Sequence, residues 1–458
     1  MLEKMDAPLL EKIENHSAKV AVVGLGYVGL PTAALFANQH YQVLGVDVNA
    51  AIVEKINNCK LDSKELGLED MVNNACKKGY FKAVVPPSAA LKDVDVIIAC
   101  VQTPVDDRGR ANLAFLKSAV EEIARNLTRS QLVIIQSTVP PKTIETVVLP
   151  ILQEKSGLRC GSDFWLSYCP ERLAPGNGLE DFMMNSRLIG AYDQESAALS
   201  KALFQSVTKG TLVVTDIGSA EISKLAENTF RFINIAFANE LARICKEIDV
   251  DVKEVIRLAN THPRVNIHNP GAGAGGPCLT KDSKMLLNTS KIGAYKATVI
   301  PAAIKVNADM PRYIAELAID GLHKAGKKPS KCKVVVFGTA YKGDVDDPRD
   351  SPSKTIISTL QEKHVPVFIY DPICTESFGA KRVLDFADAV KSADCIILAT
   401  EHRQFYDLNL LEIGSLMNKQ PIIVDAKRII NPAKAKSYGF QYLATSSVLQ
   451  SNYCSGIE

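Results

Sequence analysis

The feature that most constrains the fold is an alternation of short, continuously apolar runs with helical stretches, which occurs in two separate blocks. In the first block the apolar runs cover residues 20–26, 42–48, 94–101 and 131–138. Strands that are apolar throughout are buried on both faces, and their alternation with helices is typical of a doubly wound parallel sheet. Shorter strands are expected to complete this sheet, at 163–168, 186–190 and 211–215.

The second block is smaller, and a helical segment precedes it. Its apolar runs cover residues 333–340, 365–372, 393–400 and 421–427. The stretch 219–248 contains no Gly or Pro, and a helix longer than ~25 residues often joins domains or forms an oligomer interface. We therefore predict an α/β chain of two doubly wound, Rossmann-like domains joined by a central helical dimerisation segment. The predicted domains are 1–215, 216–325 and 326–458.

Composition excludes several classes of function. The net charge is +2 and the basic residues form no runs, so neither nucleic acid nor a membrane surface is expected as a partner. No apolar stretch approaches the ~20 residues of a membrane span, and the N-terminus has no apolar signal core, so we expect a cytoplasmic protein. The 11 cysteines form no CxxC pair, which predicts neither a metal site nor a disulfide framework.

The first strand runs into a glycine pattern that predicts a dinucleotide site. GLGYVG places Gly24, Gly26 and Gly29 around Tyr27 and Val28, where the backbone can approach a pyrophosphate at a helix N-terminus. Asp47 ends the next strand, where a carboxylate accepts hydrogen bonds from an adenosine ribose. No basic residue follows it to bind a 2′-phosphate, which favours NAD over NADP. The alternative is a glycine turn that packs a helix without any ligand.

Two threonines also follow strands of the first sheet. Thr103 and Thr138 lie at predicted carboxyl ends of strands, where open α/β sheets bind their ligands. Each is therefore a candidate contact for the cofactor, although such hydroxyls are also common where no ligand binds.

Cys278 is the candidate nucleophile. It lies in the glycine-dense segment 262–282, which interrupts helical sequence, and such loops are often functional. The glycines expose N–H donors, and Lys281 would favour the thiolate that attacks a carbonyl. A buried, inert cysteine is the alternative.

Polar residues elsewhere match this chemistry. SKLAENTFR places Lys224, Asn228 and Arg231 on one helical face. Lys224 could accept a proton and Asn228 could donate to an oxyanion. The alternative is that this face is an ordinary solvated surface. Glu171 follows a predicted strand and either activates water or lies at the surface. His262 and Arg264 either bind a phosphate or sugar or cap the helix before them.

Together these motifs resemble the UDP-glucose/GDP-mannose dehydrogenase superfamily over residues 19–445. They occur in the family's order: GLGYVGLP, QTP, QSTVPP, PERLAPG, SKLAENTFR, HPRVNIHNPG, GGPCLTKD and AYKGDVDDPRDSP. ENTFRFINIAFANEL and THPRVNIHNPG resemble most closely the branch that acts on N-acetylated sugars. This branch includes dehydrogenases of UDP-N-acetylmannosamine and UDP-N-acetylglucosamine.

The resemblance implies a four-electron oxidation of a sugar C6 hydroxyl to a carboxylate, with two NAD consumed per turnover. Cys278 would hold the aldehyde as a thiohemiacetal and then as a thioester that water hydrolyses. Lys224 would accept the proton, Asn228 would hold the oxygen or water, Glu171 would serve hydrolysis, and Asp282 would support the thiol. The resemblance also implies a homodimer, a UDP-sugar substrate and a place in polysaccharide biosynthesis.

Further positions would match the family's ligand contacts. Arg349 would approach the cofactor. The substrate contacts would be Arg172, Leu173, Arg231, His262, Arg264, Gly275, Tyr341, Lys342 and Arg428.

The identity of the sugar stays open at this point. UDP-N-acetyl-D-mannosamine is the first choice. However, Pro277 stands where the N-acetyl branch usually has His, and the tail LTKD is similar to the UDP-glucose and GDP-mannose branches. UDP-N-acetyl-D-glucosamine and UDP-glucose are therefore the alternatives.

Two other functions compete with this interpretation. A two-electron dehydrogenase also combines a dinucleotide sheet with helices, but the second sheet and Cys278 argue against it. A nucleotide sensor on a retained scaffold would not need Lys224, Asn228 and Cys278 together.

Overall fold

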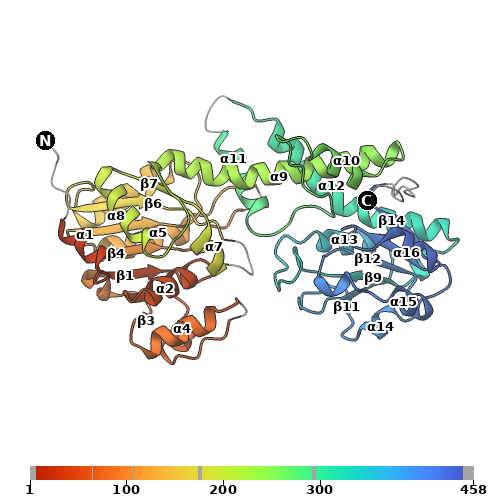
Figure 1. Cartoon of the computed structure of the whole chain (residues 1–458), viewed down its shortest axis with the longest axis horizontal. Coiled ribbons are helices and arrows are strands. Elements are labelled where there is room, and N and C mark those ends of the chain that lie inside the picture. Colours follow the sequence, from red (N-terminus) through yellow and green to blue (C-terminus); the bar gives the residue numbers. More distant parts are fainter. Residues whose placement is uncertain (1–6, 64, 107, 174–177, 291–294, 447–458) are drawn as a thin grey trace. The chain divides into compact units, whose positions relative to one another are not determined.

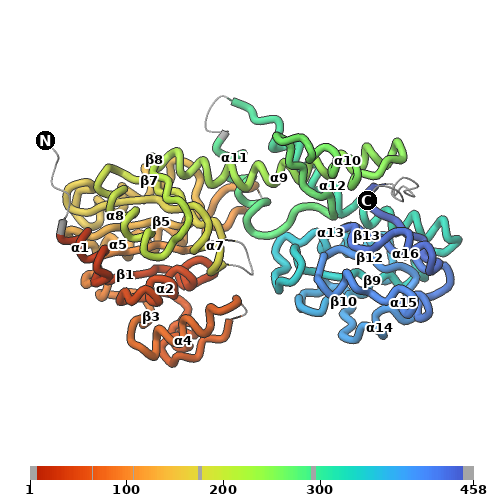
Figure 2. Tube along the Cα trace, in the orientation of Figure 1, coloured from red at the N-terminus to blue at the C-terminus, as the bar shows by residue number. Residues whose placement is uncertain are grey.

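The computed structural model describes residues 7–63, 65–106, 108–173, 178–290 and 295–446. The chain divides into two compact units, each built around one sheet. The first unit comprises residues 1–227 and 284–294, and the second comprises 228–283 and 295–458. Figure 2 traces the chain through both.

The first unit contains an eight-stranded sheet in the order β3-β2-β1-β4-β5-β6-β7-β8. Its neighbouring strands are parallel except β6 and β7, which pair antiparallel. The predicted doubly wound sheet is confirmed, and β3 is an additional strand. The bounds are β1 Lys19–Val23, β2 Gln42–Val46, β3 Phe81–Val84, β4 Val96–Ala99, β5 Gln131–Ile135, β6 Phe164–Tyr168, β7 Arg187–Ala191 and β8 Leu212–Asp216.

Helices cover this sheet because its central strands are apolar on both faces. β1, β4 and β5 are buried almost throughout, and helix α2, which packs on β1 and β2, has nine buried residues (Figure 1). The helices are α1 Ala7–Glu14, α2 Gly29–Asn38, α3 Ala50–Asn57, α4 Leu68–Lys77, α5 Ala114–Asn126, α6 Leu149–Ser156, α7 Gly178–Met184 and α8 Gln194–Gln205.

The second unit contains a six-stranded, fully parallel sheet in the order β11-β10-β9-β12-β13-β14. This confirms the second Rossmann-like sheet and adds two edge strands, β11 and β14. The strands are β9 Val334–Phe337, β10 Val367–Tyr370, β11 Lys381–Arg382, β12 Cys395–Leu398, β13 Ile422–Asp425 and β14 Gln441–Ala444. The helices around it are α13 Pro352–Glu362, α14 Phe386–Val390, α15 Leu410–Leu416 and α16 Pro432–Ser437.

The central helical segment is also confirmed. Its helices are α9 Ile217–Glu247, α10 Val252–Ala259, α11 Leu279–Ser290 and α12 Val299–Lys324. Short 3-10 or π turns occur at η1 Ala89–Asp93, η2 Ile144–Val148, η3 Pro329–Lys331 and η4 Arg403–Phe405. The irregular stretch predicted over 262–282 is shorter than expected, because α11 begins directly after Cys278. Among the described residues, no helix is both long and apolar enough to cross a membrane.

A buried carboxylate organises the edge of the second sheet. Asp371 follows β10 and accepts hydrogen bonds from the backbone N–H groups of Thr339 at 2.6 Å, Ile373 at 2.9 Å and Cys374 at 2.7 Å. The ring of His402, which is fully buried, lies 3.3 Å from it. Burial alone would raise the pKa of Asp371, but the hydrogen bonds from His402 and from these amides outweigh it and lower the pKa to about 2.

We expect Asp371 to make the stability of this unit dependent on acid. Because its folded pKa is lowered, the stabilisation is present above the unfolded value near 4 and is lost as the pH falls towards 2. The shift corresponds to about 2 kcal/mol of unfolding free energy. Urea unfolding followed by circular dichroism should therefore show that Asp371→Asn is less stable than wild type at pH 7, by an amount that shrinks below pH 4.

Asp407→Asn provides the control, because Asp407 is exposed. A deficit in Asp371→Asn that stays constant from pH 7 to pH 3 would contradict the assignment.

Candidate functional site

The glycine turn after β1 has the geometry of a dinucleotide cradle. Gly24 has a φ of +91°, and a Cβ there would lie 2.8 Å from the carbonyl oxygen of Cys100. A Cβ on Gly29 would overlap the carbonyl oxygen of Gly24 at 1.8 Å, so only glycine allows α2 to start this close to β1. A Cβ on Gly26, by contrast, would have open space around it. The turn is therefore tight on the protein side and open where a pyrophosphate would bind.

The other predicted cofactor residues lie around this turn. Asp47 is half-buried at the end of β2, and its carboxylate accepts from the N–H of Leu25 at 2.6 Å and of Asn49 at 2.8 Å. Each oxygen keeps a lone pair for a ribose hydroxyl. Tyr27 is exposed and Val28 is half-buried at the start of α2. Across the sheet, the hydroxyl of Thr103 donates to the carbonyl of Thr138 at 2.6 Å, which joins two strand ends. These residues fit NAD.

The second sheet repeats this layout but uses its carboxylate differently. Gly338 follows β9 with the same φ of +91° as Gly24, and Asp371 occupies the position that corresponds to Asp47. Asp371, however, is only 3% exposed, and both of its oxygens accept hydrogen bonds from the chain itself. It has no access to a ribose hydroxyl. Of these two carboxylates, Asp47 is the one that can bind NAD.

Lys224 and Glu171 form a buried ion pair in the first unit. Lys224, on α9, is 5% exposed, and Glu171, after β6, is 8% exposed. The Lys224 ammonium donates to the backbone carbonyl of Glu171 and lies 3.4 Å from its carboxylate, which also accepts from the N–H of Leu173 at 2.7 Å. Lys224 therefore does not lie on a solvated helix face, and Glu171 is not a surface glutamate. Such a pair can move a proton without solvent.

Arg172 lies beside this pair but is held by the protein. Its guanidinium donates to both carboxylate oxygens of Glu227, on α9, and to the carbonyl of Ser186 at 2.7 Å. The amide of Asn185 donates to the carbonyl of Arg172 at 3.2 Å. The loop that carries Glu171 is thereby tied to α9 and to the start of β7. Glu227 was not predicted, because nothing in its spacing distinguishes it from a solvated helical glutamate.

Arg187 is a second charge that sequence reasoning missed. It begins β7, is 4% exposed, and its guanidinium lies 3.9 Å from the ring centre of Phe182 and 4.7 Å from that of Phe204. Burial lowers the pKa of Arg187 to about 10, while the thiol of Cys169 and the carboxylate of Glu171 act in the opposite direction. The aromatic faces compensate part of the cost of burying this cation.

In the second unit, Cys278 lies at the point where the glycine loop meets α11. The N–H of Asp282 donates to the carbonyl of Cys278 at 2.9 Å, so the thiol stands at the helix N-terminus, where negative charge is favoured. Cys278 is half-buried, whereas seven of the ten described cysteines are buried. A partly accessible thiol at this position is suited to act as a nucleophile.

Two glycines before the thiol pack against a loop after β9. A Cβ on Gly275 would lie 2.5 Å from the carbonyl oxygen of Asp350, and a Cβ on Gly276, at φ +85°, would lie 2.6 Å from the ring of Tyr341. The N–H of Gly276 donates to the carbonyl of Arg349 at 3.1 Å. Burial, Asp347 and Cys278 raise the pKa of Tyr341 to about 12. The phenol therefore stays protonated and can donate a hydrogen bond to a ligand beside the thiol.

Asn228 and Asp282 form the second buried polar pair. Asn228, on α9, is 8% exposed and donates from its amide to the carboxylate of Asp282 at 2.6 Å; Asp282, on α11, is 1% exposed. The ammonium of Lys281 lies 3.8 Å from the same carboxylate. Since Asp282 is four residues after Cys278 on the same helical turn, the thiol and this amide belong to one local arrangement. Lys224 is one turn before Asn228 on α9.

The remaining predicted residues have varied surroundings. Arg231, Lys342 and Arg349 are exposed, and Arg349 pairs with Asp347 at 2.6 Å. His262 and Arg264 are exposed in the turn after α10, where the ring of His262 lies 3.3 Å from the N–H of Arg264.

Arg428 differs from the exposed cations. It is 7% exposed and pairs with Asp251 at 2.9 Å, and it also donates to the hydroxyl of Ser446 at 3.0 Å. A substrate phosphate would have to share it with Asp251.

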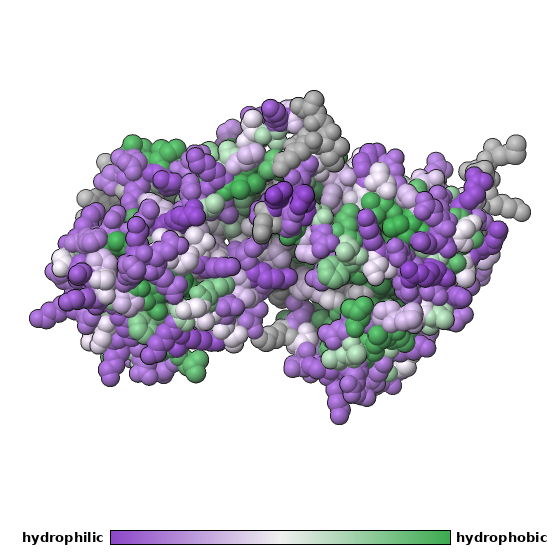
Figure 3. Space-filling model, turned by 180° about the vertical axis from the view of Figure 1, so that it is seen from behind, coloured by the Kyte–Doolittle hydropathy of each residue, from purple (hydrophilic) through white to green (hydrophobic). Residues whose placement is uncertain are grey.

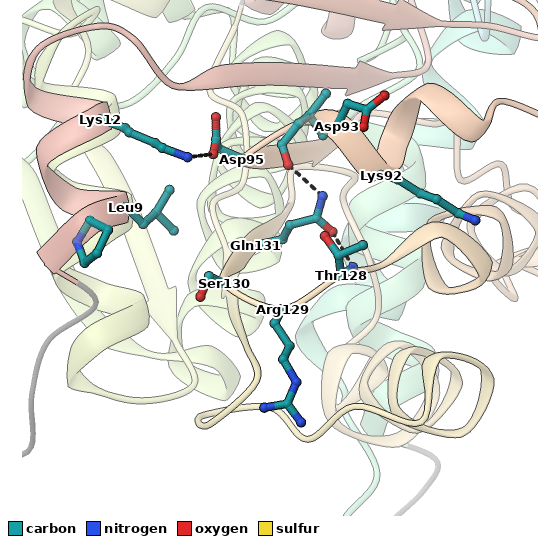
Figure 4. Close-up of a pocket in the computed structure, with 11 residues that line it drawn as sticks. Leu9, Lys12, Lys92, Asp93, Asp95, Thr128, Arg129, Ser130 and Gln131 are labelled. Atoms are coloured by element: carbon teal, nitrogen blue, oxygen red, sulfur yellow. Dashed lines mark hydrogen bonds and ion pairs between the residues drawn. The ribbon is translucent and has the colours of Figure 1, made fainter.

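A pocket at the opposite end of the first sheet does not compete with this site. Figure 4 shows its lining, which comes from α1 and from the segments that enter β4 and β5. Lys12 pairs with Asp95 at 2.7 Å, and the amide of Gln131 donates to the carbonyls of Leu91 and Val94. These contacts join groups at the amino ends of β4 and β5, whereas Gly24, Asp47 and the threonines lie at the carboxyl ends of strands.

The contact between Gly276 and Tyr341 makes a prediction about stability. Gly276→Ala should destabilise the protein through backbone strain of about 1 kcal/mol plus about 1–3 kcal/mol of overpacking against the ring. Gly439→Ala is the matched control, because Gly439 has a φ of +84° and open space around its Cβ position. Urea unfolding should show a clearly larger loss for Gly276→Ala. Equal losses in the two variants would mean that the ring does not constrain the loop.

Family models cover most of the chain. Residues 18–208 match the NAD-binding domain of the UDP-glucose/GDP-mannose dehydrogenase family, 218–309 match its central domain and 335–432 match its UDP-binding domain. The match to an NAD-binding domain confirms the cofactor inferred from the glycine turn.

Individual relatives agree with these models. The chain is 39% identical over 414 residues to UDP-N-acetyl-D-mannosamine dehydrogenase of Pyrococcus horikoshii, which covers 90% of this chain and 96% of that protein. A structure of UDP-D-ManNAc dehydrogenase from the same organism superposes with a TM-score of 0.86 at 37% identity, covering 93% of this chain and 99% of that one.

An enzyme named for a different sugar has a similar fold. A UDP-glucose dehydrogenase from Pyrobaculum islandicum superposes with a TM-score of 0.84 at 29% identity, covering 94% of this chain and 98% of that one. By sequence and by fold, the chain is an NAD-dependent oxidoreductase that belongs to the UDP-glucose/GDP-mannose dehydrogenase family.

Proposed function

We propose that this protein oxidises the C6 hydroxyl of a UDP-N-acetylhexosamine to the carboxylate, with UDP-N-acetyl-D-mannosamine as the first choice of substrate. The observation that carries the proposal is the half-buried thiol of Cys278 at the N-terminus of α11, four residues before Asp282, which is buried with its partner Asn228. A thiol in this position is not needed to oxidise an alcohol to a carbonyl, but it is needed to carry the carbonyl on to an acid.

The first oxidation needs a base and a group that stabilises an alkoxide. Two NAD, bound in succession on the first sheet, would supply the hydride acceptors for the two oxidations. The ammonium of Lys224 first passes a proton to the Glu171 carboxylate, which lies 3.4 Å away, and the neutral amine then accepts the hydroxyl proton. The amide of Asn228, one turn further along α9, donates to the oxygen as charge develops on it.

The second oxidation passes through Cys278. The thiolate sulfur adds to the aldehyde carbon, and the oxygen takes up a proton to give a thiohemiacetal. Loss of a hydride to the second NAD and of the hydroxyl proton to a base gives a thioester, and water then releases the uronate and restores the thiol. Glu171 serves as the base for that water, and Asp282 orients Asn228 and the thiol end of α11. The aldehyde stays bonded to the protein throughout.

The choice of sugar rests on the relatives and on exposed donors. Two enzymes at 39% identity, from Pyrococcus horikoshii and Methanococcus aeolicus, are named for UDP-N-acetyl-D-mannosamine. Arg231, His262 and Arg264 are exposed donors on or near the thiol loop and can bind an acetamido carbonyl or sugar hydroxyls. Tyr341, Lys342 and Arg428 belong to the unit that includes the UDP-binding domain and are assigned to the nucleotide portion.

The test is a panel of UDP-sugars assayed by NADH formation. UDP-N-acetyl-D-mannosamine should give two NADH per uronate. Its kcat/KM should exceed that of UDP-glucose roughly ten- to hundredfold, because donors that the bound sugar covers weaken binding when they are left without an acceptor. UDP-N-acetyl-D-glucosamine is the second candidate in the same panel. Cys278→Ser should lower acid formation by roughly three orders of magnitude while NAD binding persists.

Three outcomes would each remove part of the proposal. One NADH per sugar would indicate a two-electron dehydrogenase. A higher kcat/KM for UDP-glucose would assign the protein to the branch that its LTKD tail resembles. Near-normal acid formation by Cys278→Ser would remove the thiol from the mechanism.

We also propose that the protein acts as a homodimer formed along α9. In Figure 3 apolar side chains reach the surface in patches among hydrophilic ones. On α9, Phe230, Phe237 and Ile244 are spaced by seven residues and are 67%, 50% and 54% exposed. A seven-residue repeat of large apolar side chains is the pattern with which helices pair, and exposure of these side chains to water is unfavourable. A second copy of the same helix is the partner that this repeat fits.

Phe237→Asp should therefore convert the dimer to a monomer, because it places a carboxylate in the centre of the apolar seam. Light scattering after size exclusion measures the mass directly. Leu384→Asp is the control, since Leu384 is 81% exposed and lies outside the helical segment. A Phe237→Asp variant that stays dimeric would move the interface elsewhere.

Two broader assignments complete the proposal. The domains are assigned to 1–215 for NAD, 216–325 for dimerisation and the thiol loop, and 326–458 for the UDP-sugar. The cytoplasmic location expected from the sequence stays a prediction.

A further inference from the structure

The loop that leads to the thiol, residues 262–278, has no regular secondary structure, and asparagine side chains hold much of its backbone. Asn234 donates to the carbonyl of Asn266 and accepts from the N–H of His268. Asn260 binds both the N–H and the carbonyl of Ile267, and Asn239 accepts from the N–H of Gly271. An amide supplies one donor and one acceptor, so it can replace the ladder partner that an irregular backbone lacks.

The asparagine that binds the loop at the point nearest in sequence to the thiol is Asn307, on α12. Its side-chain oxygen accepts from the N–H of Ala274 at 2.6 Å, and its side-chain nitrogen donates to the carbonyl of Ala274 at 3.0 Å. Gly273 has a φ of +118°, and a Cβ there would lie 3.2 Å from the backbone oxygen of Asn307. The loop therefore approaches α12 closely, and both the N–H and the carbonyl of Ala274 are bound to that helix.

Ala274 is also anchored by packing. It lies against a small apolar cluster that contains Phe232 and Ala236 of α9 and Ala303 of α12. Leu279, the first residue of α11, packs against the same cluster. The two ends of the segment Ala274–Leu279 are thus fixed to one core, with Cys278 next to the second anchor.

Between the anchors the segment has little freedom to absorb a displacement. Gly275 and Gly276 are buried and press against Asp350 and Tyr341. Pro277 fixes its own φ. A shift of Ala274 is therefore passed along the chain to Cys278 instead of being taken up by the glycines.

We propose that Asn307 is a positioning residue that holds the Cys278 thiol at the N-terminus of α11. The proposal rests on the catalytic use of Cys278 proposed above. Asn307 does not need to contact the substrate. It acts by fixing Ala274, and through it the point at which the glycine loop delivers the thiol.

The test is Asn307→Asp, which keeps the acceptor for the Ala274 N–H but turns a carboxylate oxygen towards the Ala274 carbonyl. Iodoacetamide alkylation of Cys278, followed by mass spectrometry of its peptide, reports the thiolate without any substrate. We expect alkylation at pH 7 to slow by about fivefold or more and its pH profile to move to higher pH, because the thiolate loses its place at the helix N-terminus. The kcat for the UDP-sugar should fall by about tenfold or more, while the KM for NAD changes by less than about twofold.

The chain contains a matched control for the loss of such a contact. Asn57 binds the N–H and the carbonyl of Ala83 with the same two-bond geometry, at 2.8 Å each, in the first unit. Asn57→Asp should lower the thermal stability as Asn307→Asp does, yet leave the alkylation of Cys278 and the kcat unchanged. Asn307→Ser, which avoids the new charge, is the second variant should Asn307→Asp fail to fold.

The outcomes separate this proposal from the proposed function. If Cys278 alkylation in both Asn307 variants stays within about twofold of Asn57→Asp, or becomes faster, the positioning role is wrong whatever the enzyme oxidises. If alkylation slows as expected but Cys278→Ser still makes acid, Asn307 positions the thiol and the covalent mechanism is wrong.

Discussion

The structure depends on burying charged and polar groups on α9, which a helix can do only when each has a partner. Lys224 has Glu171, and Asn228 has Asp282. Neither ion of the first pair would be stable alone in this surrounding, because an unpaired buried charge costs several kcal/mol. The partners come from a loop after β6 and from α11. The positions of this loop and of the start of α11 therefore depend on the polar groups of α9 as well as on the apolar core.

Much of this could be predicted from sequence. The strands are apolar on both faces, so 20–26 and 333–340 were recognisable without knowledge of their neighbours. The glycine turn was recognisable because three glycines are needed where α2 starts against β1, and a Cβ on Gly29 would collide with Gly24. β3, β11 and β14 were missed because they are short strands at or near the sheet edges, with weaker apolar patterns.

The parts that could not be predicted depend on contacts between distant segments. Glu227 and Arg172 are 55 residues apart, and each is of a residue type that usually lies at the surface. Arg187 is buried only because Phe182 and Phe204 meet over it. Asn307 resembles any polar residue of a long helix until Ala274 is placed beside it. The sequence pattern of a helix or strand indicates which of its faces is apolar. It does not indicate which polar atoms will be buried away from water by a distant segment.

The comparison of Asp47 with Asp371 shows the same limit within one chain. Both carboxylates follow the second strand of a parallel sheet, and both accept from the N–H of the residue after a glycine at φ +91°. What separates them is His402, which follows β12 and reaches the carboxylate of Asp371 in the second sheet. With that ring and the backbone N–H groups of four further residues around it, the second carboxylate stabilises its own loop, whereas the first remains half-exposed and can accept from a ribose. A glycine turn followed by a strand-end carboxylate therefore predicts a binding site only when no other part of the chain occupies that carboxylate. The motif itself does not show whether such a group is present.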